Sequence, residues 1–196
     1  MRRRVLQSVV AGLVTLSASD TAGSLPDATA DYVQALEGKP SARGKLYVSK
    51  GRLRSESELA GGTIALILDP ASNQVWLLLP PPLGCVVQPM DDRMRANMPL
   101  PLSEDLTEKL VGSETLNGHP TKKYEITSAA GPLAIRYVWR ASDFRGFPIK
   151  TADESGRTIA TFENVVLGKP DPALFRTPSD CKPIPVAAGS ATPGPK

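Results

Sequence analysis

The chain alternates apolar and polar side chains with a period of two over most of its length, which is typical of β-strands. Turn sequences interrupt the alternation, notably Lys50-Gly51 and Asn117-Gly118, where glycine allows the positive φ that tight hairpins need. The pattern predicts about ten strands, at 45–49, 52–58, 63–69, 74–79, 85–88, 112–116, 121–127, 133–140, 147–152 and 157–167. Because the connections are short and no strand–helix–strand rhythm appears, we expect a curved antiparallel sheet or half-barrel.

The strands 63–69 and 74–79 are apolar on both sides, whereas an ordinary surface strand is apolar on one. Two explanations fit this pattern: a central pair buried under helices, or a pair with one face lining a cavity. The strand before them differs, because it places Arg52, Arg54, Glu56 and Glu58 on a single face. That face must be either solvated or internally paired.

Three segments predict short helices on the concave side of the sheet, at 27–37, 91–97 and 103–111. Asp27 and Ser103 are suitable N-caps for the first and the last. Methionines recur at positions 90, 94 and 98, and this spacing favours core filler over an adaptable surface above a hydrophobic ligand. The expected fold class is therefore mainly β (α+β), with a few helices covering one side.

The N-terminus has the composition of an export signal. Three arginines at positions 2–4 precede an apolar stretch at 5–16, and small residues follow, with a plausible cut between about Ser19 and Gly23. The apolar stretch is too short to span a bilayer. We expect a signal peptide at 1–23, a helical segment at 24–41, the sheet domain at 42–183 and a disordered Pro/Gly/Ala tail at 184–196, in a periplasmic or secreted protein.

The basic net charge belongs to this signal. The chain has 23 Lys and Arg against 20 Asp and Glu, and a cut after Ser19 removes three arginines and no acidic residue, leaving 20 of each. Nucleic-acid binding is not expected, because neutralising phosphates needs a basic surface excess.

Two cysteines, Cys85 and Cys181, are the only ones in the chain. In an oxidising compartment an even count favours a disulfide, which here would tie the middle of the sheet to the C-terminal segment. The rival interpretation is two separate buried thiols. Redox catalysis is disfavoured because the two residues lack the close spacing that tunes a reactive thiolate.

No constellation of catalytic residues stands out. His119 is the single histidine, beside a turn and without an evident partner, and no Gly-x-Ser-x-Gly elbow is present. One histidine and two distant cysteines do not make a zinc site. The acidic pairs at 91–92 and 104–105 lie at predicted helix starts, where they complement the dipole. We expect no cofactor and no metal, and we disfavour an enzyme.

The order of these pieces resembles the LolA-like fold of periplasmic lipoprotein carriers, and more closely secreted bacterial proteins of unknown function related to it. The matching residues, spread over about 42–183, are Gly44, Leu46, Val48, Asp69, Trp76, Pro80, Gly112, Glu114, Leu116, Asn117, Gly118, Lys123, Tyr124, Trp139, Pro148, Ile149, Lys150, Glu163, Asn164, Val165, Gly168, Asp171, Leu174, Phe175 and Pro178. The resemblance implies a curved antiparallel sheet around a hydrophobic cavity, which in the carriers accepts acyl chains. Gly84-Cys85 departs from the family, which tends to place an aromatic residue there.

The sequence therefore favours a protein that binds a lipid, a lipoprotein or another apolar molecule without catalysis. The residues that we predict to line the cavity are Leu66, Leu68, Trp76, Leu78, Tyr137 and Trp139. The alternative is an interaction or sensor module of the cell envelope that uses its sheet edges and its Pro-rich tail to contact a protein partner.

Overall fold

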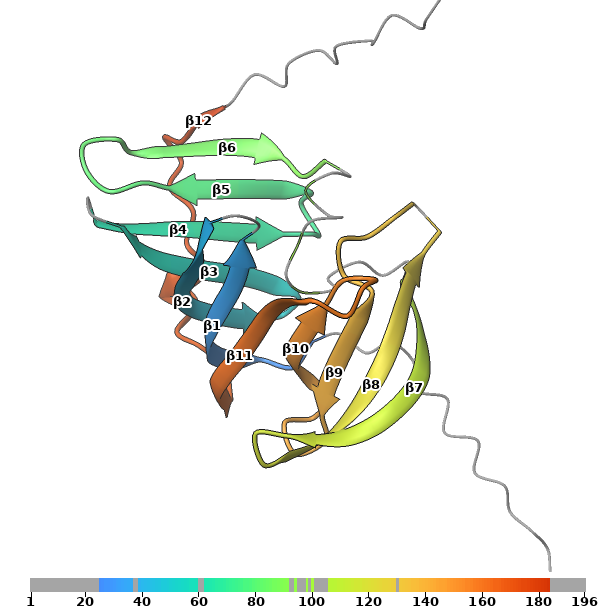
Figure 1. Cartoon of the computed structure of the whole chain (residues 1–196). Helices are drawn as coiled ribbons and strands as arrows, with labels where there is room; N and C mark the ends of the chain where they lie inside the picture. Colours follow the sequence, from blue (N-terminus) through green and yellow to red (C-terminus); the bar gives the residue numbers. More distant parts are fainter. Residues whose placement is uncertain are drawn as a thin grey trace, which may run out of the picture.

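The computed structural model describes residues 25–36, 39–59, 62–91, 94, 98, 100, 106–129 and 131–183. Within these residues the chain forms twelve strands and one 3-10 helix (Figure 1). Their bounds are β1 Ala28–Leu36, β2 Lys39–Ser49, β3 Arg52–Leu59, β4 Gly62–Asp69, β5 Gln74–Leu78, β6 Cys85–Pro89, β7 Leu106–Leu116, β8 His119–Ser128, β9 Tyr137–Ala141, β10 Phe147–Ala152, β11 Thr158–Leu167, η1 Pro172–Phe175 and β12 Lys182–Pro183.

All twelve strands belong to one open sheet, in the order β12-β6-β5-β4-β3-β2-β1-β11-β10-β9-β8-β7. Strands β1 to β6 form one meander and β7 to β11 form another. The antiparallel pairing of β1 with β11 joins them, with Tyr32 opposite Phe162. The curved, mainly antiparallel sheet that the sequence predicts is thus confirmed. One pair departs from it, because β12 lies parallel to β6, with Lys182 opposite Val86.

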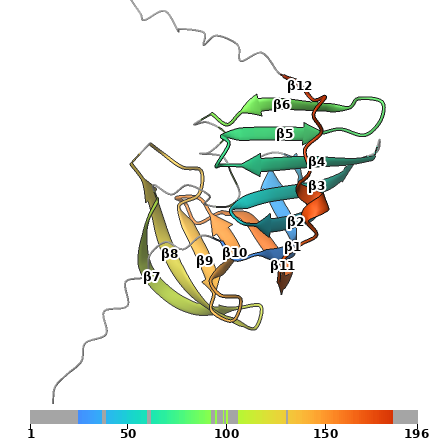
Figure 2. The same cartoon turned by 180° about the vertical axis from the view of Figure 1, so that it is seen from behind.

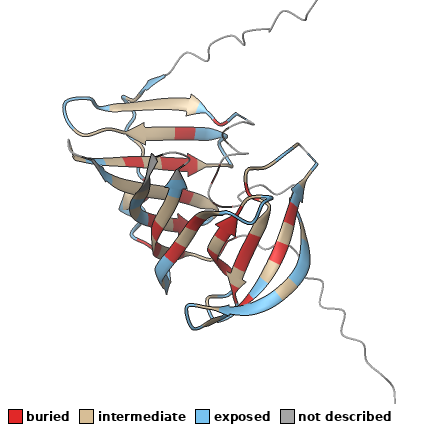
Figure 3. Ribbon diagram, viewed as in Figure 1, coloured by how far each residue is buried: buried red, intermediate tan, exposed pale blue. Residues whose placement is uncertain are grey.

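The two faces of the sheet can be assigned from the strand register, because residues directly opposite in neighbouring strands share a face. One face carries Leu46, Val48, Leu53, Leu68 and Val75, and we call it the inner face. These side chains form a single apolar cluster with Phe147 of β10 and Phe162 of β11. Since strands from both meanders meet in one cluster, the sheet curves around this face. Figure 3 shows the buried positions as bands across the middle of both meanders.

The turns are those that the sequence predicts. Lys50 and Gly51 have φ values of 52° and 75°, and Asn117 and Gly118 have 51° and 83°, so both hairpins use two residues with positive φ. In the turn between β4 and β5, the Asn73 amide donates a hydrogen bond to the Pro70 carbonyl at 3.2 Å.

The helix predicted at 27–37 is wrong, because this segment is strand β1. Its buried residues Ala28, Ala30 and Tyr32 alternate with less buried ones, and β2 and β11 hydrogen-bond to its two edges. Pairing on both edges outweighs the weak helical pattern. Strand β1 therefore belongs to the same sheet as β2, with which it pairs.

The helix predicted at 103–111 is also wrong over its described part, since β7 begins at Leu106 and pairs with β8 along its whole length. The helix predicted at 91–97 falls almost entirely outside the described residues. The signal peptide at 1–23 and the tail at 184–196 lie outside them as well.

The opposite face, which we call the outer face, carries Arg54, Glu56, Ile67 and Trp76. The polar face that the sequence predicts on β3 is internally paired, because Arg54 forms an ion pair with Glu56 at 2.6 Å. Tyr47 donates a hydrogen bond to Glu56 from the neighbouring strand.

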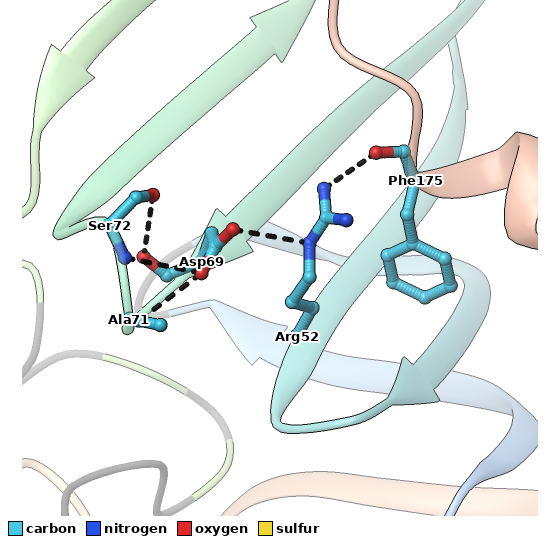
Figure 4. A network of polar contacts seen from close by, with 5 residues as sticks. All are labelled: Arg52, Asp69, Ala71, Ser72 and Phe175. Carbon is cyan, nitrogen blue, oxygen red and sulfur yellow. Dashed lines mark hydrogen bonds and ion pairs between the residues drawn. The ribbon is translucent and has the colours of Figure 1, made fainter.

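A C-terminal strap, residues 168–183, crosses this outer face from η1 to β12 (Figure 2). Arg52 and Arg54 donate hydrogen bonds to the carbonyl oxygens of Phe175 and Leu174, and the Arg52 guanidinium lies 5.3 Å from the centre of the Phe175 ring. Figure 4 shows Arg52 between Phe175 and Asp69, with which it forms an ion pair at 3.3 Å. Asp69 also accepts hydrogen bonds from the amides of the following turn.

The far end of the strap is fixed covalently, because Cys85 of β6 and Cys181 form a disulfide. This confirms the predicted bond over the alternative of separate thiols. The disulfide, β12 and the two arginines together hold the strap across β3 to β6.

Close packing at Gly44 yields a first prediction. A Cβ atom at this position would lie 1.8 Å from the Glu56 carbonyl oxygen and 2.9 Å from the Tyr32 ring. Because the backbones of β2 and β3 would have to separate, Gly44→Ala should lower the free energy of unfolding in urea by at least about 2 kcal/mol. The matched control is Gly112→Ala, where nothing lies within 4 Å of the added atom and a change within about 0.5 kcal/mol is expected. Equal effects of the two changes would contradict this account of the packing.

The strap yields a second prediction. The double change Cys85→Ser with Cys181→Ser should lower the free energy of unfolding by about 2–4 kcal/mol, because the unfolded chain regains the freedom of a long loop. Urea denaturation measures this loss. Reduction of the unchanged protein should reproduce it, whereas reductant should not affect the double variant. A double variant as stable as the oxidised parent would show that the disulfide does not hold the strap.

Candidate functional site

The inner face carries the larger of the two apolar clusters formed by the described residues, and residues from outside the sheet cover it. The connection between β6 and β7 supplies Met90, Met98 and Leu100, which are buried in the same cluster as the strands. Met94 packs against the cluster and is partly exposed. The interpretation of these methionines as core filler is thus confirmed for Met90 and Met98.

The centre of the inner face is lined by small and aromatic residues. Ala28, Ala30 and Ala160 are fully or almost fully buried, and the Phe147 and Phe162 rings meet edge to face with centroids 6.1 Å apart. Tyr32 reaches a polar partner there, since its hydroxyl lies 2.6 Å from the Ser57 hydroxyl. This surface is apolar apart from the hydroxyl groups of Tyr32 and Ser57, and sites for lipophilic molecules commonly combine apolar lining with a few polar groups.

The structure divides the six predicted cavity residues between the two faces of the sheet. Leu66 and Leu68 lie on the inner face, opposite Leu77 and Val75 of β5. Leu68 is buried in the cluster, and Leu66 packs against it.

Trp76 and Leu78 lie on the outer face, opposite Ile67 and Ala65. Ile67 and Ala65 are buried, on the side of the sheet that the strap crosses. Trp76 and Leu78 therefore cannot line the same surface as Leu66 and Leu68.

Tyr137 and Trp139 also lie on the outer face, at the other end of the sheet. Their neighbour Val138 points to the inner face, where it packs with Ile126 and Ile135 in a second, smaller apolar cluster. Trp139 is only 4% exposed, because lysine side chains and Tyr137 surround it. The predicted role of these six residues in binding stays a prediction, but they do not share one concavity.

A polar pair that the sequence did not single out lies on the inner face of β7 to β9. Arg140 forms a two-point ion pair with Glu108, and their side chains are 14% and 11% exposed. Arg140 also donates a hydrogen bond to the Gly146 carbonyl at 3.0 Å. Because β7 and β9 are separated by β8, this pairing could not be recognised from spacing along the chain.

His119 has a partner, contrary to the expectation from the sequence. Its Nδ1 atom lies 2.7 Å from a carboxylate oxygen of Asp143, and its ring contacts Phe144 with centroids 4.5 Å apart. The hydrogen bond with His119 holds the pKa of Asp143 below its ordinary value. Both side chains are at least one-third exposed, so the pair lies at the surface beside the turn.

Among the described residues, no group of three or more histidine, cysteine or acidic side chains is placed to hold a metal ion. In the same part of the chain, no helix has the length and apolar character that crossing a membrane requires. The arrangement of the inner face suits binding through apolar contact.

Comparison with known proteins found no protein-family model that matches this chain, and no curated protein that matches it. Solved structures with a similar fold were found. MucB in complex with MucA(peri) is 18% identical, covering 83% of this chain and 58% of that chain with a TM-score of 0.45. PNGF-II is 14% identical, covering 81% of this chain and 31% of that chain with a TM-score of 0.49.

A LolA superfamily protein, NE2245 from Nitrosomonas europaea, is 10% identical, covering 79% of this chain and 91% of that chain with a TM-score of 0.40. The chain spans less than two-thirds of MucB and about a third of PNGF-II.

Proposed function

We propose that this chain is a periplasmic, non-enzymatic protein that binds a lipid, the acyl chain of a lipoprotein or another apolar molecule on the inner face of its sheet. The proposal rests on the side chains that cover that face from outside the sheet. In the described residues, methionine side chains from one connecting segment complete the apolar cluster.

Methionine suits a surface that must accept different occupants, because its side chain is unbranched, polarizable and flexible. A ligand acyl chain would take the place of Met94 against the strands, since Met94 is only partly buried, while Met90 and Met98 stay in the core. Each methylene removed from water contributes about 0.8 kcal/mol, so burial of a long acyl chain can compensate for the packing that Met94 gives up when it moves aside.

The inner face also provides boundaries for such a ligand. Leu66 and Leu68 lie at one end of the apolar cluster and Phe147 lies towards the other. Gly146, the residue before Phe147, accepts a hydrogen bond from Arg140, and Arg140 forms an ion pair with Glu108, which lies opposite Ile126 of the smaller cluster. An acyl chain bound along the larger cluster would have its polar end towards this ion pair.

A second candidate, an interaction or sensor module that contacts a protein partner, has one observation in its favour. Strand β7 is the last strand of the sheet, and it exposes Leu110 by 52% and Val111 by 43%. An exposed edge can accept a strand from another chain. The irregular register between Leu110 and Gly112 works against such pairing, because bulges disrupt the ladder at an edge.

The third prediction tests the proposed site with the chain from residue 24 onward. Purified protein should contain co-purifying lipid by mass spectrometry, and delipidated protein should bind a fluorescent fatty acid. Met94→Lys should weaken that binding about tenfold, because a charged group would replace an apolar contact with the ligand. The matched control is Val166→Lys, which introduces the same charge at an exposed position of β11 and should leave binding unchanged.

Protein that carries no lipid and ignores the fatty acid would refute the proposed function. Crosslinking in the periplasm distinguishes the second candidate. A stable protein partner captured through β7 by lipid-free protein would favour the interaction module.

A further inference from the structure

We propose that the outer face of β8, β9 and β10 binds a phosphoryl group between Lys123 and Lys150, over Trp139. This site is on the opposite side of the sheet from the inner face, so it does not depend on lipid binding there. It also includes Trp139, which lies on the outer face, with Tyr137 beside it on the same face.

The strand register brings the three residues into one row. Lys123 of β8 and Lys150 of β10 are both directly opposite Trp139 of β9, one on each side. Their Nζ atoms lie 4.7 Å and 4.6 Å from the centre of the indole ring. The Lys123 Nζ atom is also 4.4 Å from the centre of the Tyr137 ring, so two aromatic rings fix its position.

Both lysines are partly buried, and neither forms an ion pair with a carboxylate of the described residues. The nearby carboxylates are engaged elsewhere. Glu125 pairs with Arg136 at 2.6 Å, and Glu114 accepts a hydrogen bond from the indole N–H of Trp139. Contact with an aromatic ring compensates only part of the loss of hydration of an ammonium group. Two ammonium groups therefore lie over one ring, and neither forms an ion pair with a described carboxylate.

A phosphoryl group fits this arrangement better than a singly charged anion does. A phosphate monoester carries a charge of about −1.5 to −2 near neutral pH and has three strong acceptor oxygens. Its oxygens can therefore accept charge-assisted hydrogen bonds from more than one ammonium group. Glu114 accepts a hydrogen bond from the indole N–H at the edge of the ring, whereas the ammonium groups lie over the ring.

The aromatic rings also reduce the entropic cost of binding. A free lysine side chain loses up to about 2 kcal/mol of conformational freedom when it is fixed. Here the rings already restrain both side chains before any anion arrives, so the site is largely preorganised. The same phosphoryl chemistry occurs in soluble phosphate esters and in lipid headgroups, and the experiment must separate these sources.

The fluorescence of Trp139 can report binding of an anion at this site. The chain has two tryptophans, so Trp76→Phe leaves Trp139 as the single one. Inorganic phosphate, titrated at constant ionic strength against chloride, should change its fluorescence with saturation. Equilibrium dialysis of labelled phosphate with the unsubstituted chain gives a second measurement that does not depend on Trp76→Phe.

Lys123→Gln and Lys150→Gln should each raise the Kd for phosphate about tenfold, the loss expected for one charge-assisted hydrogen bond. Lys150→Arg, which keeps the charge, should retain most of the binding. The matched control is Lys122→Gln, the next residue of β8, which shares the opposite face with Arg140. It changes the net charge equally. It should alter the Kd by less than about twofold, because salt screens the interaction of the Lys122 charge with an anion on the other face of the sheet.

Vesicles identify the source of the phosphoryl group. Binding to vesicles of phosphatidic acid and phosphatidylcholine, but not of phosphatidylcholine alone, with loss on adding free phosphate, supports a lipid headgroup. Saturable phosphate binding without vesicle binding supports a soluble ester. The proposal is overturned if neither phosphate nor phosphatidic acid binds, or if Lys122→Gln weakens binding as much as the other two glutamine variants. Because the inner-face variant Met94→Lys should leave phosphate binding intact, failure here is distinguishable from failure of the lipid site.

Discussion

The pairing of β1 with β11 is the contact on which the rest of the structure depends. Each meander is built from hairpins between strands that are close in sequence, and neither one alone encloses the inner face. When β1 pairs with β11, Tyr32 comes opposite Phe162, and side chains of β4 and β5 meet those of β10 and β11 in one cluster. The curvature, the burial of the small central residues and the position of the methionine cover all follow from that pairing.

A single open sheet has two faces, and this chain gives them different chemistry. The inner face is apolar and is covered by side chains of one connection between strands. The outer face is polar or cationic over much of its area, and its apolar part at Ile67 is buried on the side that the disulfide-bonded strap crosses. Polar positions on the outer face are paired, within one strand for Arg54 with Glu56 and across strands for Lys45 with Asp31. The fold can thus present two separate binding surfaces without a second domain.

Local pattern is enough to predict most of the strands and turns, because period-two alternation and glycine-containing turns are properties of short segments. It fails where a long-range partner decides the conformation. Residues 27–37 have the pattern of a weak amphipathic helix, and only the two flanking strands make this segment β1. Cysteine count predicts the disulfide because the oxidising context limits the outcomes, whereas the bond of His119 with Asp143 depends on how two turns meet.

The residues of the candidate site are even harder to predict from the local pattern. Alternation tells which residues of one strand share a face, but it does not tell which set in the next strand lies on that side. The register between β4 and β5 settles this: Asp69 is opposite Gln74, so Leu68 is opposite Val75 and Trp76 is opposite Ile67. A one-residue difference in the assumed register moves every side chain to the other face. The leucines of β4 therefore lie on the inner face and the tryptophans do not, a division that alternation alone could not predict.

The joining of the first strand to one of the last also has a consequence for biosynthesis. A chain that emerges N-terminus first exposes the apolar side of β1 to β5 well before Phe162 is available to meet it. Domains dominated by such distant pairings fold slowly, and their unpaired edges are prone to association in the meantime. The native shape of this protein therefore cannot form before β11 is available to pair with β1.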